Sequence, residues 1–130
     1  MKRFLVMLFS LLPMLAPAQE PVAQEQTQFP QQMSAGRLLE ACASSSMTRA
    51  GRERQRYCAG FVSGVEETVR ILQEQHKLEA SVCLPTGVSA KALSDVFIRY
   101  SANRRQNMGK PAAAVVLEAL KDAWPCEGSE

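Results

Sequence analysis

The most reactive side chains of this 130-residue chain are those of its four cysteines. Cysteine thiolates bind metals, attack carbon centres or pair as disulfides, and their spacing and compartment decide between these chemistries. The four are Cys42, Cys58, Cys83 and Cys126. No two of them have the C-x-x-C spacing typical of zinc sites, and no C-x-x-C-H haem motif occurs. Their even number predicts two disulfides, provided that the chain is exported.

The other reactive side chains do not form a recognisable catalytic group. His76 is the single histidine, near the end of a polar helix, where the helix dipole favours such a residue. Glu66 and Glu67 are neighbours on a helix, so their carboxylates point in different directions. The serines at 44–46 have no histidine nearby. With the cysteines paired, we expect no enzyme activity, no metal and no cofactor.

The first 18 residues predict export. Lys2 and Arg3 precede an apolar run over 4–15, and Ala16-Pro17-Ala18 supplies the small residues of a cleavage site. The run is too short to span a bilayer, so we interpret 1–18 as a removable signal peptide without later membrane insertion. The mature protein is then expected in a periplasm or outside the cell, where disulfides persist.

The mature chain divides into an arm, one domain and a short tail. Residues 19–32 are rich in glutamine and predict a disordered arm, 33–126 a helical domain, and 127–130 a tail. The chain has 15 Lys and Arg and 13 Asp and Glu, and two of the basic residues leave with the leader. A neutral mature chain gives no electrostatic reason to expect nucleic acid as a partner.

Four segments of the domain show the apolar period of amphipathic helices. Ser34, Ser89 and Pro111 are suited to start the first, third and fourth, and the second is expected over about 52–75 after a turn at 44–51. No segment alternates as a strand does. We therefore predict an all-α fold, a small disulfide-bonded bundle of about four helices. The expected apolar stripes are Leu38, Leu39 and Cys42; Cys58, Phe61, Val62, Val65, Val69 and Leu72; Leu93, Val96, Phe97 and Tyr100; and Val116, Leu117, Leu120 and Trp124.

The helix order restricts how the cysteines pair. In an up-down bundle, Cys42 and Cys58 fall at one end, and Cys83 and Cys126 at the other. About 30 Å of helix separates Cys58 from Cys83, so these two meet only if the helix bends. Of the three connectivities, the layout favours Cys42–Cys58 with Cys83–Cys126.

Gly60 and Gly64 lie four residues apart on the second predicted helix. Each lowers helix propensity by about 1 kcal/mol relative to alanine. We interpret the pair as a place where another backbone approaches closely. The alternative is that the helix simply tolerates both glycines.

Two basic segments are candidates for contact with a partner. One contains Arg49, Arg52, Arg54 and Arg56, with only Glu53 against them. Arginine presents a rigid fork of donors that suits protein interfaces. The second segment is the polar run Asn103, Arg104, Arg105, Gln106 and Asn107. The alternative is that neither segment binds a partner, and that the first is simply a solvated helix end and the second a solvated loop.

Three motifs resemble one protein family. They are CAGFVSGV at 58–65, CLP at 83–85 and WPC at 124–126. Together they are similar to the Rap/Tai-type immunity proteins for type VI secretion amidase effectors, which show a Cys-x-Gly-aromatic-aliphatic-x-Gly helix, a Cys-Leu-Pro loop and a terminal Trp-Pro-Cys in this order. The likeness covers about 38–126.

The resemblance implies a periplasmic, disulfide-bonded, helical protein that is not an enzyme. Members of that family bind a secreted peptidoglycan amidase effector and block its active-site cleft, often as homodimers. The matched residues are structural, so we expect the interface in the loops, first of all in the connection at 103–110. The alternative is a periplasmic structural or stress protein, similar to a chaperone, because one scaffold hosts several functions.

Overall fold

The computed structural model describes residues 32–127. They form four α-helices, α1 (Ala35–Cys42), α2 (Arg49–Glu74), α3 (Ala90–Ala102) and α4 (Ala112–Ala123), with the 3₁₀ turn η1 (Arg105–Asn107) before α4. Within this range the extended pairing is limited to an isolated bridge between Ser34 and Pro111. The predicted all-α class with four helices is confirmed.

Several predictions concern residues outside this range. The signal peptide at 1–18, almost all of the arm at 19–32 and most of the tail at 127–130 lie beyond the described residues and stay predictions. Among the helices of 32–127, none combines the length and the apolar character needed to cross a membrane.

Side-chain caps fix where three of the helices begin. The hydroxyl oxygens of Ser34, Thr48 and Ser89 accept hydrogen bonds from backbone N–H groups three residues further on. Such caps satisfy N–H groups that have no partner inside the helix. Thr48 starts α2 at Arg49, so the prediction of a turn over 44–51 was wrong for its last three residues.

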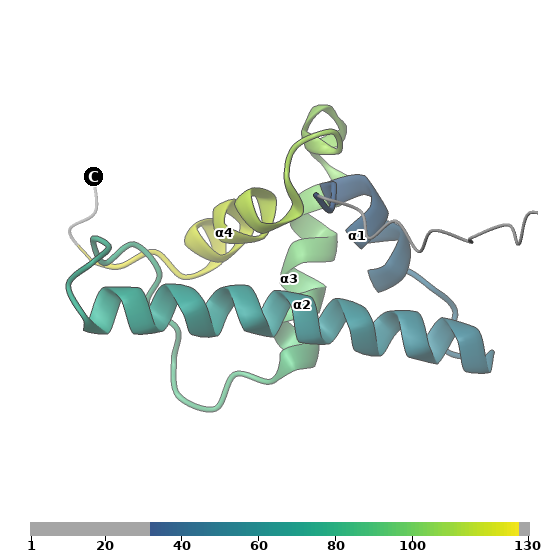
Figure 1. Ribbon diagram of the computed structural model, residues 1–130, viewed down its shortest axis with the longest axis horizontal. Helices are drawn as coiled ribbons and strands as arrows, with labels where there is room; N and C mark the ends of the chain where they lie inside the picture. The colour runs from purple at the N-terminus through teal and green to yellow at the C-terminus, as the bar shows by residue number, and fades with distance from the viewer. Residues whose placement is uncertain (1–31, 128–130) are drawn as a thin grey trace, which may run out of the picture.

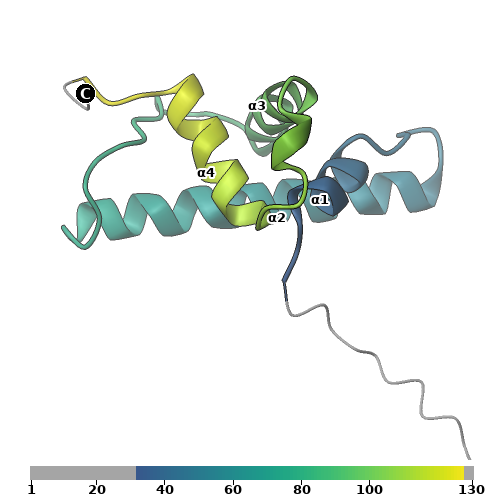
Figure 2. The ribbon, with the colours of Figure 1, turned by 90° about the horizontal axis from the view of Figure 1, so that it is seen from above.

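The helices cross rather than run up and down. Figure 1 shows α2 as the long axis and α3 passing across it, and the view turned by 90° shows that α1, α3 and α4 pack on one side of α2 (Figure 2). The predicted up-down order was wrong because the helices differ greatly in length. α2 has 26 residues, whereas α1, α3 and α4 have 8, 13 and 12 and cannot follow it from end to end.

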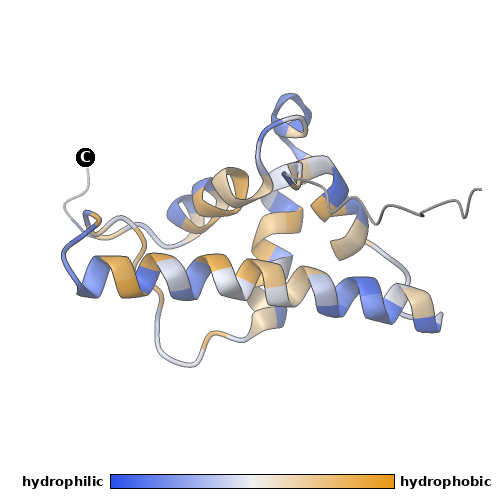
Figure 3. Ribbon diagram, viewed as in Figure 1, coloured by the Kyte–Doolittle hydropathy of each residue, from blue (hydrophilic) through white to orange (hydrophobic). Residues whose placement is uncertain are grey.

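The core lies where the three short helices meet the middle of α2. Hydrophilic residues gather near the N-terminal end of α2 and on the connection between α3 and α4 (Figure 3). Burying an aliphatic or aromatic side chain completely stabilises a fold by about 1.5–3 kcal/mol. The largest fully buried side chains are Phe97, Leu38, Leu120, Val62, Val115, Val116, Cys58 and Ser101.

Two predictions about α2 were wrong. Leu72 is 37% exposed, because the last turns of α2 extend beyond the shorter helices. Gly60 and Gly64 are exposed, and a Cβ atom on either would meet nothing within 4 Å, so no backbone of residues 32–127 approaches them closely. Gly51 is the position in α2 where only glycine fits, because a Cβ atom added there would lie 1.8 Å from the carbonyl oxygen of Ser45.

Two disulfides join the elements in the pairing that the helix order favours. Cys42–Cys58 connects the end of α1 to α2, with Cα atoms 5.1 Å apart. Cys83–Cys126 connects the loop before α3 to the segment after α4, with Cα atoms 5.0 Å apart. They close 16 and 43 residues of sequence, which corresponds to about 3 and 4 kcal/mol in the chain-entropy model.

Candidate protein-binding site

The side chains with catalytic potential are either paired or isolated. All four cysteines are in disulfides. His76 is exposed and lies two residues beyond α2 in a left-handed conformation (φ 54°), not within the helix. The Ser44 hydroxyl donates to the Glu40 carbonyl. Within 32–127, no three His, Cys, Asp or Glu side chains gather as metal ligands.

The connection between α3 and α4, residues 103–111, projects from the body of the protein (Figure 1). We call it the α3–α4 loop, and η1 forms its outer turn. It contains the polar run that the sequence predicts as a partner-binding segment. Its conformation is fixed from two sides, by α1 and by α4.

The N-terminus of α1 supports one side of the loop. The backbone N–H groups of Ala35 and Gly36 donate to the carbonyl oxygens of Lys110 and Met108, each at 2.9 Å. These donors would otherwise have no partner, because the first N–H groups of a helix face no preceding turn. A Cβ on Gly36 would lie 3.3 Å from the Met108 oxygen, so a larger residue would press on the loop.

A single carboxylate on α4 supports the other side. Glu118 Oε2 accepts a hydrogen bond from the Tyr100 hydroxyl at 3.2 Å and one from Asn107 Nδ2 at 3.5 Å. Lys110 Nζ lies 3.5 Å from Glu118 Oε1. Burial, together with the negative charge of Glu118, raises the pKa of the Tyr100 hydroxyl, so the phenol is protonated at neutral pH and donates. Nearby Arg104 lowers this pKa by a smaller effect.

The five predicted contact residues separate into two groups. Arg104 is directed inward: its guanidinium carbon lies 3.9 Å from the centroid of the Tyr100 ring, and its Nη2 is 3.6 Å from Asp122 Oδ1. Asn107 is only 8% exposed. The residues directed to solvent are Asn103, Arg105 and Gln106. These three are therefore the side chains of the run most accessible to a partner, while Arg104, 36% exposed, is partly covered.

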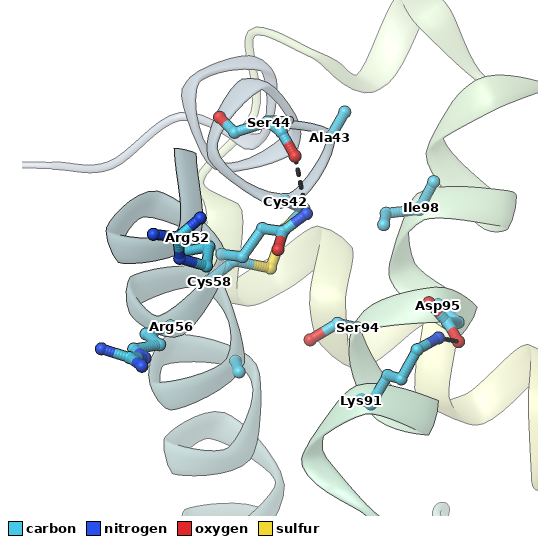
Figure 4. Close-up of a pocket in the computed structure, with 12 residues that line it drawn as sticks. Cys42, Ala43, Ser44, Arg52, Arg56, Cys58, Lys91, Ser94, Asp95 and Ile98 are labelled. Carbon is cyan, nitrogen blue, oxygen red and sulfur yellow. Dashed lines mark hydrogen bonds and ion pairs between the residues drawn. A yellow bond between two sulfur atoms is a disulfide. The ribbon is translucent and has the colours of Figure 1, made fainter. Parts of the chain in front are cut away.

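The other basic segment borders a groove of about 520 Å³ between the end of α1, the first half of α2 and α3 (Figure 4). Arg52 and Arg56 extend from α2 away from α3, while Lys91 and Asp95 bond to each other along α3 at 2.6 Å. Arg52 also donates to a turn carbonyl. The groove contains no nucleophile beside a base, so its surface offers contacts rather than catalysis. Its apolar lining comes from Cys42, Ala43, Cys58, Ala59 and Ile98.

Sequence reasoning missed the residues that hold the loop. Tyr100 carried a signal, because a tyrosine at the edge of an apolar stripe usually directs its hydroxyl to a partner. Glu118 carried none: it lies between apolar residues of α4, and its partners are up to 18 residues away in sequence. Gly36 carried no signal either, because a close approach between two distant segments produces no recognisable pattern in the sequence of either one.

Comparison with protein families matches residues 34–126 to the family described as Rap1a immunity proteins. Neither the curated proteins nor the solved structures gave a significant match. The matched range begins at the cap of α1, ends at the last cysteine, and includes the four helices and both disulfides. It also includes the complete α3–α4 loop. The chain therefore belongs to the Rap1a immunity protein family, whose members are inhibitors of type VI secretion effectors and not enzymes.

Proposed function

We propose that this chain is a periplasmic immunity protein that binds a peptidoglycan amidase effector of a type VI secretion system and occludes its active-site cleft. The observation that carries the proposal is the family match over 34–126. The two disulfides support a compartment outside the cytosol, because reducing systems in the cytosol keep cysteine thiols reduced and unpaired.

The proposed contact surface is the outer face of the α3–α4 loop. A protein that blocks a cleft without chemistry needs a segment that projects and has a defined shape before binding. This loop projects from the body (Figure 1) and is held by α1 and α4, so little conformational freedom is left to lose on binding. Asn103, Arg105 and Gln106 are the side chains that would reach the amidase.

Co-expression tests the proposal. The amidase effectors encoded in the same genome as this chain would each be directed to the periplasm of a bacterial host, with and without the full-length protein. We expect one effector to lyse cells and the protein to restore growth. The purified pair should form a stable complex on size exclusion, and the protein should stop peptidoglycan cleavage in vitro.

Two results would contradict the proposal. One is that no encoded amidase binds the protein or is inhibited by it. The other is that the protein gains dye-binding apolar surface at low pH and prevents other proteins from aggregating, without any amidase interaction. That second result would favour the chaperone-like alternative.

A further inference from the structure

We propose that Glu118 is a positioning residue, which holds the α3–α4 loop in the conformation that binds the effector. This inference rests on the proposed function for its binding part. Its structural part, the conformation of the loop, is independent of any partner. The two parts can therefore fail separately.

Glu118 connects both ends of the loop with its outer turn. Tyr100 belongs to the last turn of α3, directly before the loop, and Asn107 ends η1. Lys110 precedes α4, at the other end of the loop. All three contact the one carboxylate, at 3.2, 3.5 and 3.5 Å. No other side chain of 32–127 joins three segments around the loop in this way.

The buried amide of Asn107 makes the contact important for the shape of the loop. Asn107 is 8% exposed, and Glu118 is the acceptor for its side-chain N–H group. A buried donor without an acceptor is strongly unfavourable, so without Glu118 this amide would turn toward water and take η1 with it. Because the Glu118 side chain is itself 41% exposed, removing it would leave no cavity in the core. The effect should therefore fall mainly on the loop, with only a small loss of overall stability.

Loss of a binding conformation has a kinetic signature. If only a fraction of the molecules hold the loop correctly, the apparent Kd rises by the inverse of that fraction. The association rate constant falls by the same factor, whereas dissociation of the formed complex changes little. A residue that touched the effector would instead change mainly the dissociation rate constant. The two roles are therefore separable.

Three variants of the full-length protein test the proposal. Glu118→Ala removes all three contacts. Glu118→Gln keeps one carbonyl oxygen, which suffices for Tyr100 and Asn107 because both contact the same oxygen in the wild type. Asp95→Ala is the matched control: its carboxylate is 40% exposed and also pairs with a lysine, but it lies near the start of α3, away from the loop.

Hydrogen exchange and binding kinetics are the measurements. In Glu118→Ala we expect at least tenfold faster exchange at the amides of Asn107, Met108 and Lys110, which are bonded within the loop. We expect roughly tenfold slower association with the amidase effector identified by co-expression and dissociation within about twofold of the wild type. Thermal stability should fall slightly below that of Asp95→Ala, by about as much as in Tyr100→Phe, which loses the same Tyr100–Glu118 hydrogen bond. Glu118→Gln should stay within about threefold of the wild type in exchange and association.

The proposal is overturned if loop exchange in Glu118→Ala equals that of the wild type, if Glu118→Gln is as impaired as Glu118→Ala, or if the loss of affinity lies in dissociation. If the wild-type protein binds no amidase effector, the proposed function fails. The exchange data then still decide whether Glu118 holds the loop.

Discussion

The guanidinium carbon of Arg104 lies 3.9 Å above the ring of Tyr100, so this arginine packs on α3 while its neighbour Arg105 remains in solvent. Two adjacent arginines of the same loop thus have different structural roles. Arg104 belongs to the support of the loop, and Arg105 belongs to its outer face.

Charge reversal should separate these roles. Arg105→Glu is expected to weaken effector binding roughly tenfold without changing thermal stability, because the side chain is exposed and has no ion pair within 32–127. Arg104→Glu should weaken binding too, and in addition it should lower the free energy of unfolding by about 1 kcal/mol. The change removes the contact with Tyr100 and places the new carboxylate beside that of Asp122. Surface plasmon resonance and thermal melts measure the two quantities. Arg54→Glu, an exposed change on α2, is the control, and equal effects of all three variants would argue against this loop.

Two glycines of α2 should respond to alanine in opposite directions. In Gly51→Ala the new Cβ would overlap the Ser45 carbonyl oxygen, so we expect a loss of about 3 kcal/mol in unfolding free energy. Gly60→Ala fills open space on the helix and should add up to about 1 kcal/mol. Urea denaturation of both variants measures this. A destabilising Gly60→Ala would contradict the open surface described here and would indicate that a second molecule covers it.

The Tyr100 hydroxyl predicts a loss of stability at high pH. Its pKa is raised in the folded state, mainly by burial and then by Glu118, so its contribution is fully present below the unfolded pKa of about 10. The contribution is lost as the pH rises through the folded pKa. We expect the stability difference between the wild type and Tyr100→Phe, about 1 kcal/mol at pH 7, to shrink above pH ~10. Chemical denaturation at several pH values tests this, with Tyr57→Phe as the control, and a constant difference would refute the assignment.

The two disulfides should differ in their sensitivity to reduction. Cys42 and Cys58 are 6% and 1% exposed, whereas Cys83 is exposed to solvent. Access of a thiolate to sulfur limits exchange, so mild reductant should open Cys83–Cys126 first. Timed alkylation and mass mapping give the order. Opening of Cys42–Cys58 first would show that the end of α1 detaches readily from α2.

The local features of this fold follow from sequence, and the relations between distant segments do not. Ser34 and Ser89 start their helices as predicted, because a cap depends on residues within one turn. The start of α2 was placed late, since the small polar residues before it resemble a turn and conceal the cap at Thr48. The crossing of α3 over α2 depends on packing between segments that lie far apart in the sequence.

The α3–α4 loop shows the same division. Its position and polarity were predictable from residues 103–110. Which of its side chains face outward was not predictable, because this depends on Tyr100, Glu118 and Asp122, which belong to two other elements. The glycine pair Gly60 and Gly64 misled for a related reason: the spacing permits a close neighbour, but only the packing of the other helices decides whether one is there.

The bond from the Ala112 N–H to the Met33 carbonyl, at 2.7 Å, joins the point where the described domain begins to the start of α4, directly beside the loop. A purification tag joined directly ahead of Met33 would therefore start next to the proposed contact face. The opposite terminus leaves the fold at Cys126, beside the loop that precedes α3, in another part of the molecule (Figure 1). Immobilisation through the C-terminus is thus the geometry that leaves the loop accessible in a binding assay.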